Sequence, residues 1–201
     1  MKKMISYGKK EIEHISKSDK LLGEFIHKTG YVKRYSFDDF FHGLCYNIIN
    51  QQLSMKAADS LYAKIENKVG TITPEKMCNS ELLYECGLSR TKANCISLCA
   101  EKIIGGELSE NRLSEMSDEN IIKTLTEIHG IGAWTAEMTL IFCLGRKDVL
   151  SLSDFGIRKG LSILHGIDIK DITVMRKYKE LYSPFGTVAS IYLWEIKEKN
   201  I

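Results

Sequence analysis

Several features that mark other classes of protein are scarce in this sequence. Among its 201 residues there are two prolines, and few stretches alternate apolar with polar residues, the pattern that indicates strands. The apolar runs are short and interrupted, Met138–Leu144 being one of them, so none is long enough to span a bilayer. The basic N-terminal residues are followed by polar ones where a signal peptide needs an apolar core. We therefore expect an all-α protein with no membrane partner, located in the cytoplasm.

The cysteines lack the spacing of a metal site. None of the six forms a C-x-x-C motif, and Cys95 and Cys99 lie one helical turn apart, as packing residues of a helix do. Cys45 and Cys143 have apolar neighbours. We expect ordinary reduced thiols that are partly buried.

The net charge is also small. There are 28 lysines and arginines and 26 acidic residues, which gives +2 at pH 7. A protein that binds nucleic acid by electrostatics alone is usually far more basic. Affinity for DNA would therefore have to come from the local placement of lysine, arginine and backbone amides.

Apolar residues recur instead at helical spacing, with residues that start and end helices beside them. Ser36, with Asp39 three residues later, is expected to begin a helix whose apolar stripe covers Phe40–Ile49. Ser54 is expected to cap the next helix, which ends before Gly70. Further helices are predicted over Thr91–Ile104, Ala133–Leu144, Phe155–Leu164, Val174–Tyr182 and Thr187–Glu198. The prediction is roughly nine or ten helices and no convincing strand, in a single module over residues 1–201.

The most informative segment is the turn Gly130-Ile131-Gly132. It joins two predicted helices, the second of which begins at once and includes Thr135. Glycine tolerates unusual φ values and lets another backbone come close, while Ile131 anchors the turn in the core. Backbone amides at the start of the second helix point outward at the positive end of its dipole, where a phosphate oxygen binds. Such a hairpin needs no basic side chain to bind DNA, although two glycines alone would equally fit a plain turn between packed helices.

Four segments together carry a resemblance to the helix–hairpin–helix superfamily of DNA glycosylases. The first is Leu125–Glu137, within a helix–hairpin–helix of about residues 121–144, and the others are Ile48–Ala58, Gly87–Ala93 and Asp148–Gly160. The last resembles the segment that carries the catalytic aspartate in 3-methyladenine DNA glycosylase II, the alkylation-repair branch. The similarity covers residues 36 to 196 or so. It implies a two-lobed helical fold with an active-site cleft between the lobes, and double-stranded DNA with a damaged base as the partner.

Asp154 occupies the position of that aspartate. By residue type alone, Ser153 or Asp154 would be the N-cap of the helix that follows. The resemblance implies a catalytic role for Asp154. Its carboxylate would stabilise the positive charge that builds up on the sugar as the base leaves, and would orient or deprotonate a water.

The same resemblance implies further site residues. Gln52, with Leu53 beside it, falls at the position of the residue that wedges into DNA when the target base is rotated out. Trp134 and Trp194 fall at aromatic positions of the base pocket, and Met138, one turn after Trp134, is expected to line it. Electron-poor alkylated bases stack well on indole rings. Without the resemblance, both tryptophans would be read as core residues.

Trp134 also bears on the reaction. Bifunctional relatives that nick the strand carry a lysine there, so the resemblance implies a monofunctional glycosylase without lyase activity, and Lys92 is interpreted as a charge that faces solvent or phosphate. No cysteine follows Cys143 to hold the iron–sulfur cluster of endonuclease III relatives. No organic cofactor is implied, only a Na+ or K+ ion at hairpin carbonyls such as those of Ile128 and Gly130. A monomer without an obligate protein partner is expected.

The sequence departs from the family pattern at a few positions, and two other interpretations stay open. His129 stands where many hairpins have proline, Leu150-Ser151 replaces a frequent Phe-Pro, and Gln52 is polar where some relatives use leucine. One alternative is a non-catalytic helix–hairpin–helix DNA-binding protein, against which the spacing of Asp154 argues. The other is a glycosylase for mismatched or oxidised bases.

Overall fold

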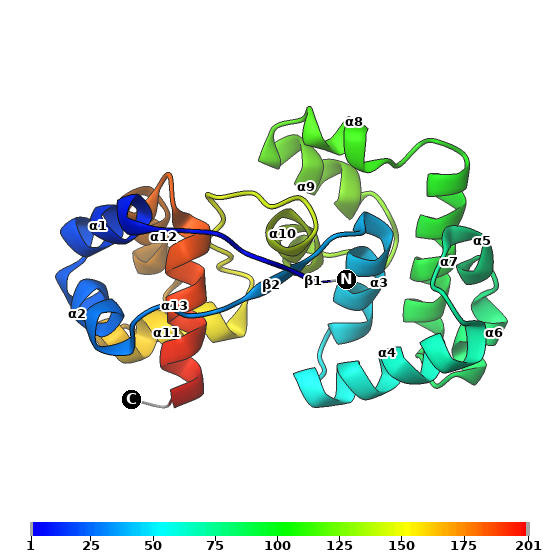
Figure 1. The fold of residues 1–201 in the computed structure, drawn as a ribbon, viewed down its shortest axis with the longest axis horizontal. Helices are drawn as coiled ribbons and strands as arrows, with labels where there is room; N and C mark the ends of the chain where they lie inside the picture. Colours follow the sequence, from blue (N-terminus) through cyan, green and yellow to red (C-terminus); the bar gives the residue numbers. More distant parts are fainter. Residues whose placement is uncertain (1, 200–201) are drawn as a thin grey trace. The chain divides into compact units, whose positions relative to one another are not determined.

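The computed structural model describes residues 2–199 of the chain, and in them it contains thirteen helices and one two-stranded sheet (Figure 1). The strands are β1 (Lys2–Met4) and β2 (Tyr35–Phe37). The helices are α1 (Lys9–Ser18), α2 (Lys20–Thr29), α3 (Phe40–Asn50), α4 (Met55–Val69), α5 (Pro74–Met77), α6 (Ser80–Glu85), α7 (Arg90–Ile104), α8 (Glu110–Ser114), α9 (Asp118–Thr126), α10 (Ala133–Phe142), α11 (Phe155–His165), α12 (Ile172–Tyr182) and α13 (Gly186–Lys199). None of these helices is both long and apolar enough to cross a membrane.

Contacts between residues divide the chain into two compact units. The first, called the hairpin unit, is Phe37–Leu144. The second, called the carboxylate unit, combines Lys2–Ser36 with Gly145–Ile201. The carboxylate unit is therefore built from both ends of the chain.

The core of the hairpin unit lies around α10. Every residue from Thr135 to Ile141 is buried, and α10 packs on α3 and α9. A helix that is apolar on all sides has to be surrounded by other elements, and this one contains most of the apolar run Met138–Leu144. The helix α3 contacts α4 and α7 as well, so it links the hairpin to the rest of this unit.

The central element of the carboxylate unit is α13, whose residues Gly186–Leu193 are all buried. It packs on α11, α12 and α1. The closest approach is to α11, where Gly160 lies against the backbone carbonyl of Leu193 and a Cβ atom would overlap that carbonyl. A glycine at this point lets the two helices come closer than any side chain would allow.

The prediction of a mainly helical protein is confirmed, with differences at particular residues. Two strands of three residues each are present where the sequence predicts none, because segments this short show no alternating pattern. The prediction that Ser36 begins a helix is wrong: Ser36 lies in β2, and Asp39 caps α3 by accepting the N–H of His42 at 2.7 Å. The helices outnumber the prediction because elements such as α5 and α8 have only four and five residues.

Candidate active site and DNA-binding elements

The hairpin between α9 and α10 has the local geometry that its glycines predict. Gly130 has a φ of +99°, which residues with a side chain rarely adopt, and a Cβ atom there would lie 2.8 Å from the Cβ of Cys95. Ile131 is 5% exposed, and its N–H donates to the carbonyl of Ile128 at 3.0 Å. The turn is therefore pressed onto α7 through Gly130, and Ile131 is buried in the core, as the sequence predicts.

The second glycine of the hairpin, Gly132, lies at the start of α10. Gly132 is the N-cap of α10 at a φ of −96°, with no side-chain hydrogen bond capping the helix. A Cβ atom on Gly132 would meet nothing within 4 Å. The N-cap residue thus offers no side chain to the first N–H groups of α10, which lie at the positive pole of the helix dipole. This arrangement suits a phosphate oxygen of a nucleic-acid backbone.

The loop that contains the predicted wedge residue, Gln51–Ser54, is called the wedge loop. It joins α3 to α4. Gln52 is exposed, Leu53 is 39% exposed, and Gln52 has a φ of +55°, the sole positive value at a described residue other than glycine. Non-glycine residues held in this region cluster at ligand-binding and active sites. The loop therefore presents two side chains to solvent from a strained backbone.

Asp154 is the N-cap of α11, as its residue type predicts, and it is buried, with 9% of its surface exposed. Its Oδ1 accepts the backbone N–H of Ile157 at 2.8 Å and the indole N–H of Trp194 at 2.9 Å. A buried carboxylate is costly unless it is hydrogen-bonded. The two donors on a single oxygen fix the plane of the carboxylate as well as its position.

Two glycines of α11 make the contact between Asp154 and Trp194 possible. At Gly156 a Cβ atom would lie 2.8 Å from Cδ1 of Trp194 and 3.0 Å from Oδ1 of Asp154. One helical turn later, Gly160 gives α13 its close approach. Local sequence patterns give these glycines no separate role, although their spacing of four residues marks one face of the helix.

The segment that leads to Asp154 is also fastened to α13. Thr187 donates its hydroxyl to the carbonyl of Arg146 at 2.7 Å and accepts the N–H of Val149 at 3.2 Å. Ser190 donates to the carbonyl of Val149 at 2.8 Å. At the start of α13, Asp148 accepts the N–H of Gly186 at 3.0 Å. The helix α13 thus positions both the backbone before Asp154 and its carboxylate.

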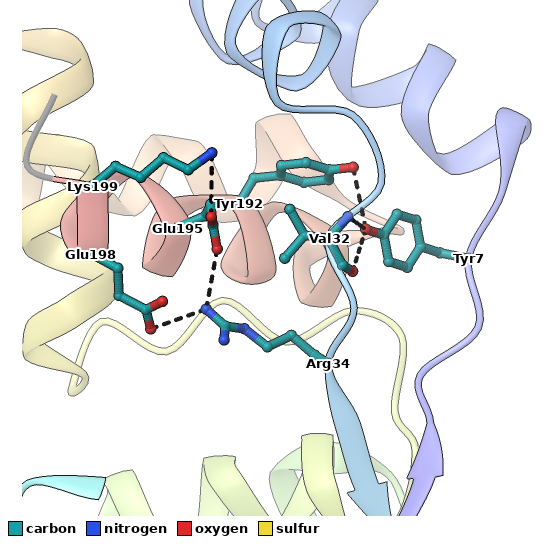
Figure 2. Close-up of polar contacts among 7 residues, drawn as sticks. All are labelled: Tyr7, Val32, Arg34, Tyr192, Glu195, Glu198 and Lys199. Carbon is teal, nitrogen blue, oxygen red and sulfur yellow. Dashed lines mark hydrogen bonds and ion pairs between the residues drawn. The ribbon is translucent and has the colours of Figure 1, made fainter. Parts of the chain in front are cut away.

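The N-terminal part of the chain holds α13 in turn, through a buried tyrosine (Figure 2). The hydroxyl of Tyr7 donates to the carbonyl of Val32 at 2.8 Å and accepts the N–H of Val32 at 2.9 Å. It lies 3.2 Å from the hydroxyl of Tyr192, which donates to the carbonyl of Gly30 at 3.0 Å. Burial is the main reason why the pKa of Tyr7 is raised well above its ordinary value, so this hydroxyl stays protonated. Tyr192 stands two residues before Trp194.

A second contact in the same region is ionic. Figure 2 shows the side chain of Arg34 reaching toward two carboxylates on α13, Glu195 at 3.5 Å and Glu198 at 3.0 Å. Lys199 lies 3.3 Å from the other oxygen of Glu195. These groups are partly exposed, so each pair contributes little to stability. The contacts nevertheless join the segment before β2 to the turn of α13 that carries Trp194.

The remaining predicted pocket residues belong to the hairpin unit. Trp134 lies in the first turn of α10 and is half-buried, and Met138 is 3% exposed in the core. Thr135, predicted to contact the DNA backbone, is 1% exposed, so it contributes its backbone N–H to the helix start rather than an exposed hydroxyl. The stacking of a base on Trp134, Met138 or Trp194 stays a prediction, and for Trp194 the structure adds a hydrogen bond that the sequence does not reveal.

The interpretation of Lys92 as a solvent- or phosphate-facing charge is wrong. Its ammonium group donates to the carbonyls of Ile49 and Gln51 at 2.8 and 2.6 Å, and burial lowers the pKa of Lys92. Gln51, for which the sequence alone predicts no role, donates its side-chain amide to the carbonyl of Gly130. Both residues lie within segments that carry the resemblance, and their position there is the signal that could have found them.

The hairpin carbonyls expected to hold a cation already accept protein hydrogen bonds. The carbonyl of Ile128 accepts from Ile131 at 3.0 Å, and that of Gly130 accepts from Gln51 at 2.9 Å. These bonds account for one lone pair of each oxygen without any ion. The cation stays a prediction, and no step of the reaction is derived through it. In the described residues, the six cysteines are free thiols, five of them buried.

Comparison with known proteins places these elements in a family. Residues 45–184 match the model of the HhH-GPD superfamily of base excision DNA repair proteins. The chain belongs to this superfamily. It is 33% identical over 183 residues to DNA-3-methyladenine glycosylase 1 of Schizosaccharomyces pombe, which covers 88% of this chain and 78% of that relative.

Solved structures of HhH-GPD relatives agree in fold. A DNA-3-methyladenine glycosidase of Bacillus halodurans matches with a TM-score of 0.83 and 34% identity, covering 97% of this chain and 92% of that one. A 3-methyladenine DNA glycosylase of Schizosaccharomyces pombe in complex with abasic DNA matches with a TM-score of 0.85 and 30% identity, covering 94% and 97%. These findings confirm the predicted superfamily and its alkylation-repair branch. The matched residues 45–184 include the wedge loop, the hairpin and Asp154, whereas Trp194 lies beyond them.

Proposed function

We propose that this protein is a monofunctional DNA glycosylase that hydrolyses the N-glycosidic bond of alkylated purines, of the 3-methyladenine type, in duplex DNA. The observation that carries the proposal is the buried carboxylate of Asp154, held by Trp194 at 2.9 Å in a chain of the HhH-GPD superfamily. The names of its relatives support the alkylated base as substrate. Both units are proposed to serve this one activity, in a monomer.

The chemistry asked of Asp154 is electrostatic and positional. As the bond between the sugar C1′ and the base nitrogen breaks, the electron pair leaves with the base and positive charge develops on the sugar. A fixed carboxylate beside the sugar stabilises this charge. It also orients a water, whose oxygen bonds to C1′ while its proton passes to the carboxylate or to solvent. Because the hydrogen bonds from Ile157 and Trp194 exist before the reaction, the group needs little reorganisation during it.

Recognition is proposed to use the two elements of the hairpin unit. The N–H groups at the start of α10 bind a phosphate of the DNA backbone, and the wedge loop inserts Gln52 or Leu53 where the target base has been rotated out. Extrusion of a base costs a few kcal/mol, and damage reduces that cost. The extruded base is proposed to stack on an indole ring, for which Trp134 and Trp194 are the two candidates. Backbone amides supply the attraction that a net charge of +2 does not.

The absence of strand cleavage is part of the proposal. A lyase reaction at Trp134 would need an amine that attacks the sugar C1′ and forms a Schiff base, and an indole cannot do so. We expect base release from alkylated duplex DNA to leave an intact strand that breaks only on later treatment with alkali. Trapping with borohydride should yield no covalent protein–DNA adduct. A covalent adduct between the wild-type protein and the DNA would contradict the monofunctional assignment.

The test of the whole proposal is the variant Asp154→Asn. Asparagine still caps a helix, so we expect stable protein that binds abasic duplex DNA but releases 3-methyladenine and 7-methylguanine at least about a hundredfold more slowly. Asp171→Asn is the matched control, since Asp171 caps α12 by the same kind of bond, to the N–H of Val174 at 3.0 Å. It should retain the wild-type rate. Full activity in Asp154→Asn would contradict the mechanism.

The same assay decides between the other interpretations. If the wild-type protein binds DNA but releases nothing from alkylated, deaminated, mismatched or oxidised duplexes, the protein is a binding module. If only mismatched or oxidised bases are released, the family assignment stands and the substrate proposal is replaced.

A further inference from the structure

We propose that Gln51 and Lys92 are positioning residues, which hold the wedge loop in register with the hairpin so that base extrusion is coupled to backbone binding. The proposal rests on the proposed function, because it takes the wedge loop as the element that enters the duplex. It adds two residues, and a division of labour, that neither the family match nor the names of the relatives assign.

Gln51 connects the two DNA-binding elements directly. Its side-chain nitrogen donates to the carbonyl of Gly130 at 2.9 Å and to the hydroxyl of Thr135 at 2.9 Å. Gly130 is in the hairpin turn, and Thr135 is in the first turn of α10. One amide therefore bridges from the first residue of the wedge loop to a backbone carbonyl before the phosphate-binding helix start and to a side-chain hydroxyl after it. This residue is half-buried, so water competes only in part for these bonds.

Lys92 holds the same residue from the other side. Its ammonium group, on α7, donates to the carbonyls of Ile49 and Gln51 at 2.8 and 2.6 Å. These carbonyls lie at the C-terminal end of α3, where the helix leaves its last acceptors without partners and carries partial negative charge. A cation at this end satisfies both. Gln51 is thus fixed through its backbone by Lys92 and through its side chain by the hairpin.

The conformation of the next residue explains why such restraint is needed. Gln52 has a φ of +55°, a region that residues with a side chain leave unless their neighbours hold them there. On the N-terminal side the neighbour is Gln51, with its bonds to the hairpin and to Lys92. Removal of these bonds frees the loop to relax, and the Gln52 side chain then loses its fixed direction.

The expected consequence is selective. The N–H groups at the start of α10 belong to the helix and do not depend on the wedge loop, so binding to undamaged duplex should persist. Insertion of the wedge, and with it extrusion of the base, should weaken. A residue that merely stabilises the fold would instead lower the fraction of active protein and leave the rate of the folded fraction unchanged.

The decisive experiment is a double-mutant cycle between Gln51→Met and Gln52→Ala. Methionine keeps the size of Gln51 and removes its donors. We expect Gln51→Met to slow single-turnover base release about tenfold, the size expected from losing two hydrogen bonds. In the Gln52→Ala background the same change should slow release less than about twofold, because the brace acts by holding Gln52, the wedge residue of this proposal, and has no effect once that side chain is gone. Additive effects in the cycle would overturn the proposal.

A second readout does not depend on catalysis. A duplex with an abasic analogue and 2-aminopurine as its neighbour reports unstacking as a rise in fluorescence. The wild-type protein should produce this rise, and Gln51→Met and Lys92→Met should produce much less of it at saturating protein. Lys92→Arg should restore most of the signal, because a guanidinium can also donate to two carbonyls. Lys28→Met, which removes an exposed lysine of α2, is the control for loss of one charge.

The outcomes separate this proposal from the proposed function. If wild-type protein releases the base and unstacks 2-aminopurine, while Gln51→Met and Lys92→Met match it in both assays, the brace is wrong and the glycosylase stands. If wild-type protein does neither, the proposed function is wrong and the brace falls with it. If Gln51→Met fails to fold, the cycle of Lys92→Met with Gln52→Ala carries the same test with the same expected results.

Discussion

The indole N–H of Trp194 donates to Oδ1 of Asp154 at 2.9 Å, across 40 positions of sequence. Without this bond Asp154 would be one helix N-cap among several in the chain. With it, the carboxylate is held by a second helix and is fixed before any substrate binds. The contact requires glycine at position 156, because a side chain there would meet both the indole and the carboxylate. A hydrogen bond, an aromatic ring and a missing side chain together define this corner of the site.

The first prediction concerns that hydrogen bond. Trp194→Phe keeps an aromatic ring and removes the donor, so base release should slow about tenfold or more, as expected for loss of a hydrogen bond to a charged group. Trp134→Phe serves as the comparison, because it reduces the area of an aromatic ring system by the same amount at the other predicted stacking position. Single-turnover release from alkylated duplex measures both. An equal loss in the two variants would show that ring area, not the hydrogen bond, matters at position 194.

A second prediction concerns the close approach of α11 and α13. In Gly160→Ala the added methyl group would overlap the backbone carbonyl of Leu193. The backbone of α13 cannot move aside as a flexible side chain does. The free energy of unfolding should fall by about 1–3 kcal/mol or more, and base release should fall with it because Trp194 is displaced. Gly8→Ala is the control in the same unit, since its Cβ would lie 3.9 Å from the nearest atom. Gly8→Ala should lower the free energy of unfolding by less than about 1 kcal/mol. Urea unfolding measures the loss in both variants.

The sequence predicts best those features that depend on neighbouring residues. The hairpin turn follows from Gly130 and Ile131, and Asp154 is recognisable as an N-cap because capping is a bond within three residues. The family resemblance then adds a role to a position that local rules already explain. Local rules fail where two signals compete, as at Ser36 and Asp39, where the aspartate is the cap.

Contacts between distant residues are what the sequence could not provide. The sequence predicts an exposed charge at Lys92, because nothing near this residue in the sequence indicates that the end of α3, some 40 positions earlier, lies beside it. Trp194 is predicted from the resemblance only as a stacking surface. The partner of its indole N–H, Asp154, comes close to it only when α11 and α13 pack together. The close approach of α11 and α13 depends on glycines at positions 156 and 160. From the sequence, a glycine is usually interpreted as part of a turn rather than as a point of close packing between helices.

A third prediction compares the two contacts by which the N-terminal segment holds α13 (Figure 2). Tyr7→Phe leaves the N–H and the carbonyl of Val32 without partners in a buried place, which should cost about 1–3 kcal/mol of stability. Arg34→Gln removes partly exposed ion pairs and should cost under about 1 kcal/mol. Urea unfolding measures both losses.

The control for this comparison is Tyr31→Phe. The ring of Tyr31 stacks on that of Tyr7 at 4.4 Å, but Tyr31 is 48% exposed, so loss of its hydroxyl should change stability little. If Tyr31→Phe costs as much as Tyr7→Phe, the burial of the Tyr7 hydroxyl is not what stabilises this contact.

The last prediction is a pH dependence of stability that arises at Asp19. Its carboxylate is buried and accepts hydrogen bonds from the hydroxyl of Tyr182 at 2.6 Å and the N–H of Leu22 at 3.1 Å, with Nε2 of His165 at 2.9 Å. Burial alone would raise the pKa of Asp19, but the nearby imidazole of His165 and the hydrogen bonds from Tyr182 and Leu22 outweigh it, so the pKa lies below its ordinary value of 3.8. The ionised form is therefore favoured in the folded protein.

The sign of the effect follows by linkage. Because the folded protein binds this proton less readily than the unfolded chain, the stabilisation from Asp19 is fully present above the unfolded value of 3.8 and is lost as pH falls through the lower folded pKa. Asp19→Asn should be less stable than wild type at neutral pH, with a difference that shrinks as the pH is lowered below 3.8. Unfolding by urea across this range measures the difference. A difference that stays constant, or grows toward acid, would show that Asp19 is not held ionised by these partners.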